Sequence, residues 1–379
     1  MWRAYLIEIM TGLVGAEIEM STNGRYDITL NAVSHATVTV QKSSLTHIPS
    51  RWLRPWAHGV LLTFESEHEP ETPILAGPFT ASPDEFPDSL SFPVSDIRAI
   101  FEYRFASAED FGINASAQRA STLSYSNTSL AFIAQDLVRK GMGKKAGHLP
   151  IRFANEIPRG QGGGHERTYH GYDLANNNID KRLQELSDVI GGPDIMFRPE
   201  WVDPNSHQYI RWALHTGTHG YPVIPQNWTM VIDASSQRSQ VSELTMNVDS
   251  SHYATRFYAT GDGEGTGIRM AIRENNRLYA DQHPLLEATQ AWPSVSEAAT
   301  LGAYASAGVD IRPYIELRAT IDASDVRSPF GRWHVGDKAI VKPGPWHHIP
   351  DVERGLRILR SSGDFDSPHT TLYFQEDQW

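Results

Sequence analysis

The sequence predicts a mainly β protein in which two β domains, each a barrel or a sandwich, flank a mixed α+β insert. Strand-like runs separated by turn residues fill the first part of the chain and return near its end. Three stretches with helical spacing stand apart from these runs. We therefore predict a first β domain at 1–118, a mixed α+β insert at 119–238, and a second β domain containing one helix at 239–379.

The bulk composition is that of a folded protein without a dedicated nucleic-acid surface. Of 379 residues, 40% are apolar, and 33 basic against 45 acidic residues give a net charge of −12. A nucleic-acid binder needs a basic surface to neutralise phosphates, so this balance argues against that class. The absence of cysteine excludes disulfides, thiolate catalysis and cysteine-ligated zinc, and it is compatible with assembly in a reducing cytoplasm.

Neither a membrane span nor a signal peptide is expected. A spanning helix needs ~20 consecutive apolar residues, and no stretch approaches this length. The apolar run at 4–16 contains Glu8 and lacks a basic start and a cleavage region. We expect this run to form the first strand.

Alternating apolar positions and turn residues predict the first β domain. Strand-like runs lie at 2–9 and 14–20. Asn23-Gly24 is a strong hairpin signal and precedes an alternating strand at 26–30. Further strands are expected at 36–41, 59–66, 72–80 and 88–94.

The insert begins with an amphipathic helix over 126–143. Asn127 or Thr128 can cap its start, and Gly141 can end it. Its apolar face consists of Leu130, Ile133, Ala134 and Leu137.

A second helix at 173–192 leads into a strand pair at the centre of the chain. Gly191 ends the helix, and two short strands rich in aromatic residues follow within 187–215. Nothing in this segment has a catalytic pattern, so we interpret the pair as an architectural ribbon. The apolar positions of the helix are Ile179, Leu183, Leu186 and Ile190.

The second β domain holds the third helix, at 293–308. Ser294 and Glu297 fit a capping box, and Gly308 can close the helix. Strand-like runs surround it, at 242–249, 254–262, 267–275, 313–321, 336–344, 355–365 and 370–375.

Two glycine-rich stretches are interpreted as loops. Residues 261–267 fit the GxGxxG pattern loosely, but a strand-like run follows where a nucleotide site needs a helix. Residues 156–171 lack the Gly-Lys-Ser/Thr ending of a phosphate-binding loop. A hairpin loop and an exposed loop are therefore expected, and no cofactor.

No catalytic or metal-binding pattern is complete. His215 and His219 are four apart but lie in a turn-like stretch, and His347-His348 lie in a proline-rich one. The chain contains neither HExxH nor GxSxG. We expect neither a catalytic residue nor a catalytic metal.

Acidic residues alternate at Glu65, Glu67, Glu69 and Glu71. In a strand they would share one face, and the favoured interpretation is a solvated edge or strand end. The alternative is an acidic contribution to a shared lumen, which would repel DNA phosphates.

Ten tryptophans make an interface plausible, because large amphipathic rings are favoured where proteins meet. The interface candidates are Trp52, Trp56, Trp201 and Trp212, for each of which a core position is the first interpretation.

The order of these elements resembles the tail hub proteins of long-tailed bacteriophages, and in particular of actinobacterial phages. Each motif is weak alone, and the likeness lies in their order over nearly the whole chain. The motifs are GRYDITLNAV at 24–33, ILAGPFT at 74–80, GGPDIMFRP at 191–199, FYATGDGEG at 257–265, HPLLEAT at 283–289, PYIELRATI at 313–321 and RWHVGDKAIVKPG at 332–344.

The resemblance implies a non-enzymatic virion protein at the tail tip, assembled in the cytoplasm of the host bacterium. Each subunit would supply two tube-like β-barrel domains that flank the mixed insert. Three subunits would form a homotrimeric hub ring that joins the hexameric tail tube to the tip, with the insert outside or below the ring. Distal tail, tail tube, tape measure and tip or receptor-binding proteins would be its partners, and viral DNA would only pass through. The chain stops after a strand, so we expect cell-wall cutting to lie in another protein.

Three alternatives stay open. A distal tail ring or baseplate adaptor would be hexameric, so stoichiometry separates it from a trimeric hub. A glycan-binding β protein or glycoside hydrolase would bind purified cell walls and lose that binding on Trp→Ala substitution. A secretion-system or phage-derived particle hub would share the fold and differ in genomic setting.

Overall fold

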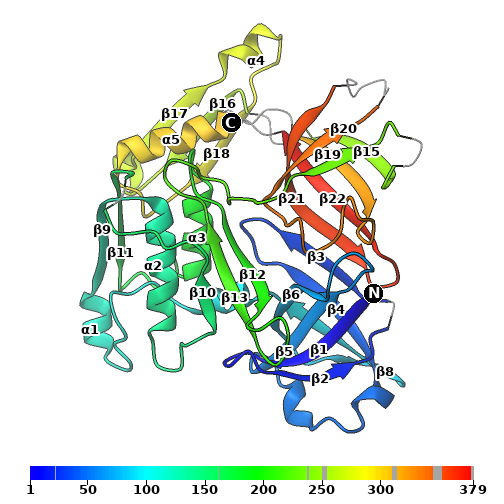
Figure 1. Ribbon diagram of the computed structural model, residues 1–379. Coiled ribbons are helices and arrows are strands. Elements are labelled where there is room, and N and C mark those ends of the chain that lie inside the picture. The colour runs from blue at the N-terminus through cyan, green and yellow to red at the C-terminus, as the bar shows by residue number, and fades with distance from the viewer. Residues whose placement is uncertain are drawn as a thin grey trace.

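The computed structural model describes residues 1–379 except 22, 161, 237–238, 250–253, 310–313, 345–351 and 377–379. The chain is mainly β, with a helical layer on one side of the molecule (Figure 1). The N-terminal strands and the C-terminal strands lie next to each other, although the whole insert separates them in sequence.

The first sheet has four antiparallel strands in the order β2-β1-β5-β6. Strand β1 is central, and Ala4 and Leu6 on one side and Ile7 on the other are all buried. The strands are β1 (Trp2–Glu8), β2 (Val14–Ile18), β5 (His58–Phe64) and β6 (Thr72–Pro78). Short 3₁₀ helices η1 (Lys42–Leu45) and η2 (Ser50–Leu53) precede β5.

The second sheet has ten strands and joins the two ends of the chain. Its main path is β15-β19-β22-β21-β3-β4-β8-β7, with β20 paired to β21 and β14 paired to β20. Strand β21 pairs antiparallel with β3, and this pairing is the seam between C-terminal and N-terminal strands. The strands are β3 (Arg25–Thr29), β4 (His35–Gln41), β7 (Asp84–Glu85), β8 (Ser89–Ser95), β14 (Met230–Asp233), β15 (Val241–Asp249), β19 (Tyr314–Asp322), β20 (Lys338–Lys342), β21 (Arg354–Asp364) and β22 (His369–Glu376).

The sheets are open, in place of the closed barrels that the resemblance implies. Among the described strands no sheet closes on itself, and single bridges at Met20–Val40 and Phe79–Val94 link the first sheet to the second. The hairpin prediction at Asn23-Gly24 is wrong, because β2 and β3 belong to different sheets. Strand β3 pairs with β4 and β21 instead, and a turn signal cannot report this distant pairing.

Residues 97–216 combine three α-helices and the 3₁₀ helix η3 with two small sheets. Strands β12 and β13 form the predicted antiparallel pair, but β10 joins β13 in parallel, so the ribbon is a three-stranded sheet. The elements are η3 (Ile97–Tyr103), α1 (Ala115–Ala120), β9 (Thr122–Thr128), α2 (Leu130–Met142), β10 (Ile151–Phe153), β11 (His165–His170), α3 (Ile179–Ser187), β12 (Ile195–Trp201) and β13 (Ile210–Thr216).

Helices α2 and α3 begin or end away from the predicted residues. Ser129 caps α2 through a hydrogen bond from Phe132 N at 3.2 Å, while Asn127 and Thr128 belong to β9. The helix continues through Gly141 because Gly143 provides its C-terminal cap. Helix α3 ends at Ser187, which leaves Ile190 58% exposed rather than on the apolar face.

The loop prediction for 156–171 holds only for its first part. Residues 165–170 form β11, which pairs antiparallel with β9. The hairpin loop predicted at 261–267 does join β16 to β17 and contains the 3₁₀ turn η4 (Gly265–Gly267).

Residues 254–309 form a three-stranded sheet with α5 packed on it. Its order is β17-β16-β18, and it projects beyond the insert (Figure 1). The predicted capping box is wrong, because Glu297 directly precedes α5 and the Ser294 hydroxyl accepts from Arg182 at 3.1 Å. The elements are β16 (Arg256–Thr260), β17 (Met270–Glu274), α4 (Asn276–Ala280), β18 (Glu287–Ala291) and α5 (Ala298–Val309).

Two apolar cores hold these parts together. One contains side chains of the N-terminal strands and of β19 to β22, such as Val38, Ile321 and Phe374. The other contains side chains of the insert and of residues 254–309, such as Leu137 and Phe257. The domain boundaries at 118 and 238 stay a prediction.

Candidate functional site

The outer face of the ten-stranded sheet is a broad polar surface. In β3, Tyr26 and Ile28 are buried in the core, so Arg25, Asp27 and Thr29 lie on the opposite face. The strand registers continue this face in two rows. One row is His35, Asp27, Ser362, Thr371, Thr320 and Glu243, and the other is Thr29, Arg360, Tyr373, Arg318 and Thr245.

Hydroxyl groups and compensated charges dominate this face. The Thr320 and Thr371 hydroxyls are 3.0 Å apart. Arg360 Nε donates to Asp27 Oδ1 at 2.8 Å, and the Arg360 guanidinium lies 4.7 Å from the centre of the Tyr373 ring. Arg318 lies 5.0 Å from the same ring, so two cations share one aromatic side chain. These two cations are therefore already engaged within the chain.

An open groove of about 520 Å³ follows the seam between β3 and β21 on this face. Charged side chains of both signs, hydroxyl groups and a glycine line it, including Arg25, His35, Ser362, Gly363 and Asp364. The groove offers hydrogen bonds without a net positive charge.

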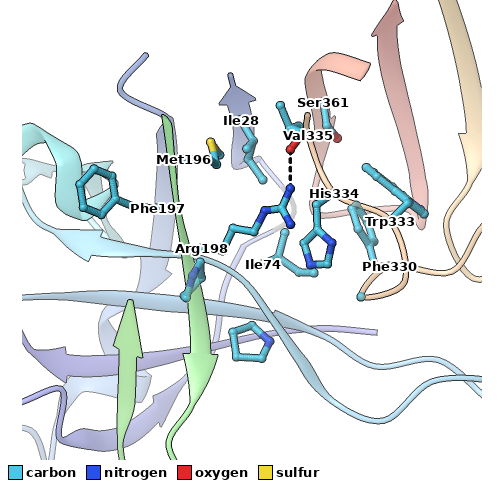
Figure 2. Close-up of a pocket in the computed structure, with 13 residues that line it drawn as sticks. Ile28, Ile74, Met196, Phe197, Arg198, Phe330, Trp333, His334, Val335 and Ser361 are labelled. Atoms are coloured by element: carbon cyan, nitrogen blue, oxygen red, sulfur yellow. Dashed lines mark hydrogen bonds between the residues drawn. The ribbon is translucent and has the colours of Figure 1, made fainter. Parts of the chain in front are cut away.

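Behind the seam, a small cavity of about 50 Å³ lies where the N-terminal strands, the insert and the C-terminal strands meet. Figure 2 shows the Arg198 guanidinium between Val335 and His334. It donates to Val335 O at 2.9 Å and to Asp337 Oδ1 at 3.3 Å. Apolar walls come from Ile28, Ile74, Met196, Phe330 and Trp333.

Burial controls the charges at this junction. Burial lowers the pKa of Arg198, while the adjacent Asp337 carboxylate opposes that shift. Burial also lowers the pKa of His215 to about 3, and the nearby Arg198 charge adds to the effect. His215 is therefore neutral in the folded protein at ordinary pH.

A carboxylate connects all three parts of the chain at one point. Asp194 immediately precedes β12, is buried and forms an ion pair with Arg357 of β21. Its carboxylate also accepts from Ile224 N at 3.1 Å and from Asn31 Nδ2 at 3.4 Å. Asn31 in turn accepts from Ile195 N at 2.7 Å. The insert is thereby fixed against both halves of the shared sheet.

The four alternating glutamates form the loop between β5 and β6, so they do not share one strand face. Glu65 pairs with Arg3 at 2.8 Å, and Glu69 pairs with Arg332. Glu71 accepts from the Thr63 hydroxyl at 2.6 Å, while Glu67 is exposed. Their place in a lumen stays a prediction.

The four candidate tryptophans differ in exposure. Trp212 is fully buried and donates to Ala76 O at 3.0 Å. Trp201 is buried, donates to Glu71 O at 3.0 Å and stacks on the His207 ring. Trp52 and Trp56 are half-buried and keep part of their rings at the surface. Interface roles stay predictions for all four.

His215 and His219, which the structure describes, do not form a metal site with carboxylates. His219 lies near His165, with ring centres 6.4 Å apart, while His215 belongs to β13. In the described part of the chain, no group of three or more His, Asp or Glu side chains could hold a metal ion. His347 and His348 lie outside the described residues.

No helix in the described ranges is long and apolar enough to cross a membrane.

Comparison with solved structures shows which proteins share this fold. A tail protein of Neisseria meningitidis MC58 matches with a TM-score of 0.55 and 12% identity, over 99% of this chain and 97% of the other. The 43 kDa tail protein of prophage MuSo2 from Shewanella oneidensis matches with a TM-score of 0.55 and 9% identity, over 99% and 98%. A chain of the Francisella PdpA–VgrG complex matches with a TM-score of 0.52 and 9% identity, and this chain covers 57% of it.

This chain has the fold of phage tail proteins. No protein-family model and no curated protein matches its sequence. At such low identity the likeness shows the fold alone, so the hub role and the actinobacterial origin stay predictions.

No functional sequence pattern indicates the polar sheet face. Asp27 and Arg360 are 333 positions apart, and neither has a recognisable functional pattern around it. The one signal was the alternation of polar residues in the strand-like runs that became β3 and β21.

Proposed function

We propose that this chain is a non-enzymatic structural subunit of a phage-type tail. Three copies would form a hub ring at the distal end, joining the tail tube to tip proteins. The observation that carries the proposal is the ten-stranded sheet, which N-terminal and C-terminal strands build together. A single continuous sheet gives each subunit a stiff, wide wall, as a tube segment requires.

In this proposal, the polar sheet face lines the passage for DNA. Its hydroxyl groups are neutral, and Arg318 and Arg360 are engaged by Asp27 and Tyr373. A surface with few free cations releases few counterions on meeting DNA and therefore does not retain it. The net charge of −12 also repels DNA and so reduces its retention.

The remaining partners follow from the ring. The tail tube and distal tail proteins would contact one side of the ring, and tip or receptor-binding proteins the other. The tape measure protein would occupy the passage before DNA does. The insert, fixed by Asp194, would stand outside or below the ring as a docking element.

Mass in solution and image symmetry in isolated tails test the proposal. Three copies in a closed ring support the hub. Six copies indicate a distal tail or baseplate adaptor ring. A stable monomer that never enters a particle contradicts both and leaves binding to host-wall glycans as the role to examine.

A secretion-system hub is the second candidate function. A chain of the PdpA–VgrG complex shares this fold, and this chain spans little more than half of it. Purified phage-type tails that contain the chain support the first role, and its recovery only with secretion components supports the second.

A further inference from the structure

One surface of the N-terminal part is cationic in an acidic protein. Residues 28–64 contain no aspartate or glutamate, although the whole chain has 45. Arg51 and Arg54 are exposed there, and within the described ranges neither forms an ion pair with a carboxylate. The exposed Arg51 and Arg54 guanidinium groups are therefore open to an external partner.

Aromatic rings accompany these arginines. The Trp56 ring packs edge-on against Tyr103 with ring centres 4.8 Å apart, and Tyr103 is 67% exposed. Trp56 has a φ of +65°, a left-handed conformation that bulky residues rarely adopt, and its N–H donates to Phe79 O at 2.9 Å. The backbone thus holds the ring in a fixed position at the surface. We call Arg51, Trp52, Arg54, Trp56 and Tyr103 the cationic aromatic surface.

The turn between β7 and β8 has the complementary chemistry. Asp84, Glu85 and Asp88 are exposed, and Phe86 between them is 52% exposed. Phe86 N donates to Ser89 O at 2.9 Å, which closes the turn. Lys42 pairs with Glu85 at 2.7 Å and holds the turn against η1. We call Asp84, Glu85, Phe86 and Asp88 the acidic tip.

The two features lie at opposite ends of β8. The acidic tip leads directly into Ser89, the first residue of the strand. The other end reaches Val94, which bridges Phe79 next to Trp56. Phe86 lies beside Ser89 in the closed turn, and a strand advances about 3.3 Å per residue, so the five residues from Ser89 to Val94 place the acidic tip roughly 17 Å from Val94. The acidic tip therefore cannot reach the cationic aromatic surface of its own chain.

We propose that the acidic tip of one copy docks on the cationic aromatic surface of the next copy. Phe86 would pack against Trp56 and Tyr103, and the aspartates would face Arg51 and Arg54. Such a contact joins different patches, so repeated copies close a ring when the rotation per copy fits. Arginine, tryptophan and tyrosine are also the residues that dominate interface energies. The inference rests on the proposed ring and names the patches that close it.

Charge reversal tests the contact in the full-length chain. One variant carries Arg51→Glu and Arg54→Glu, a second carries Asp84→Arg and Asp88→Arg, and a third carries all four. Sedimentation velocity over a concentration series should show each double variant associating roughly tenfold more weakly or worse. The fourfold variant should recover most of the wild-type association, because the charges are exchanged rather than lost.

Control variants separate this contact from general charge effects and from misfolding. Arg119→Glu with Arg277→Glu makes the same charge change at exposed positions elsewhere, and it should leave association unchanged. Phe86→Ala removes the ring without changing any charge, and it should also weaken association. Matching circular dichroism and thermal unfolding confirm that each variant is folded.

The outcomes distinguish this inference from the proposed function. A wild-type chain that stays monomeric and never enters a particle overturns both. If both double variants and Phe86→Ala form the ring with the same affinity as the wild type, this inference is wrong and the proposed ring stands. Weakened double variants with no recovery in the fourfold variant also contradict direct pairing of the two patches. This inference is also contradicted if the cationic aromatic surface binds anionic cell-wall polymer and its substitution leaves assembly unchanged.

Discussion

Arg360 Nε donates to Asp27 Oδ1 over 2.8 Å, and this ion pair joins β21 to β3 across 333 positions of sequence. Its side chains are 43% and 31% exposed, so water screens much of the attraction. The pair nevertheless lies at the seam where the C-terminal strands meet the N-terminal strands. The Arg360 guanidinium also lies 4.7 Å from the Tyr373 ring centre, and this contact limits the conformations of the Arg360 side chain to those near Asp27.

A double-mutant cycle on Asp27→Ala and Arg360→Ala should give a small coupling energy. We expect about 0.5–1 kcal/mol, because the pair is partly exposed and the backbone ladder carries most of the seam. Urea unfolding of the four proteins measures it, and high salt should reduce it. A coupling above about 3 kcal/mol would show that the pair behaves as a buried one.

Arg198→Met should destabilise the protein far more than Arg211→Met. Removing Arg198 leaves the buried Asp337 without its cation, at a cost of about 3 kcal/mol or more. Arg211 pairs with Glu200 at 2.5 Å in a more exposed position, where Arg152 also neutralises that carboxylate, so its loss should cost under about 1 kcal/mol. The free energies of unfolding in urea decide this. Equal losses for the two variants contradict the burial argument.

Acid should destabilise the fold partly through His215. Its pKa is lowered to about 3 in the folded state, while an unfolded histidine titrates near pH 6.5. The unfolded chain therefore binds the proton first, so stability is complete above pH 6.5 and falls progressively as the pH decreases toward 3.

His215→Gln should flatten this part of the pH profile. Between pH 7 and 4, wild-type protein should lose a few kcal/mol more unfolding free energy than the variant. His47→Gln, at an exposed position, is the control and should follow the wild-type profile. Parallel profiles for wild type and His215→Gln would exclude burial of a neutral His215 as a source of acid sensitivity.

Local pattern was enough to predict most strands and the three longer helices. Alternation predicted β3, β21 and β22, and helical spacing predicted α2, because the apolar face of each element is encoded within one short segment. The prediction of the capping residue was wrong where several candidates are adjacent in sequence, as at Ser129, which follows Asn127 and Thr128. A capping residue is selected by the local backbone path, which the residue types alone do not determine.

Pairing between distant segments could not be predicted from the residues. Asn23-Gly24 indicated a hairpin, yet β3 pairs with β4 and β21, since register over hundreds of positions depends on the whole core. The contacts that join Asp194 to Asn31 and Arg357 could not be predicted for the same reason. Likewise, the alternation of the four glutamates suggested a strand, whereas their backbone forms the loop between β5 and β6.

Placing cations on the polar sheet face should make the passage retain DNA. Thr320 and Thr371 lie on this face with hydroxyls 3.0 Å apart, so Thr320→Lys with Thr371→Lys adds two charges per copy without disturbing the core. Each additional phosphate that a lysine neutralises should steepen the dependence of log K on log salt by about 0.9. Filter binding of DNA to the assembled ring measures this, and Ser116→Lys with Ala120→Lys in α1 is the matched control. If both variants bind DNA equally, the sheet face does not line the passage; if only the sheet variant binds DNA more tightly, the polar face is the surface past which DNA moves.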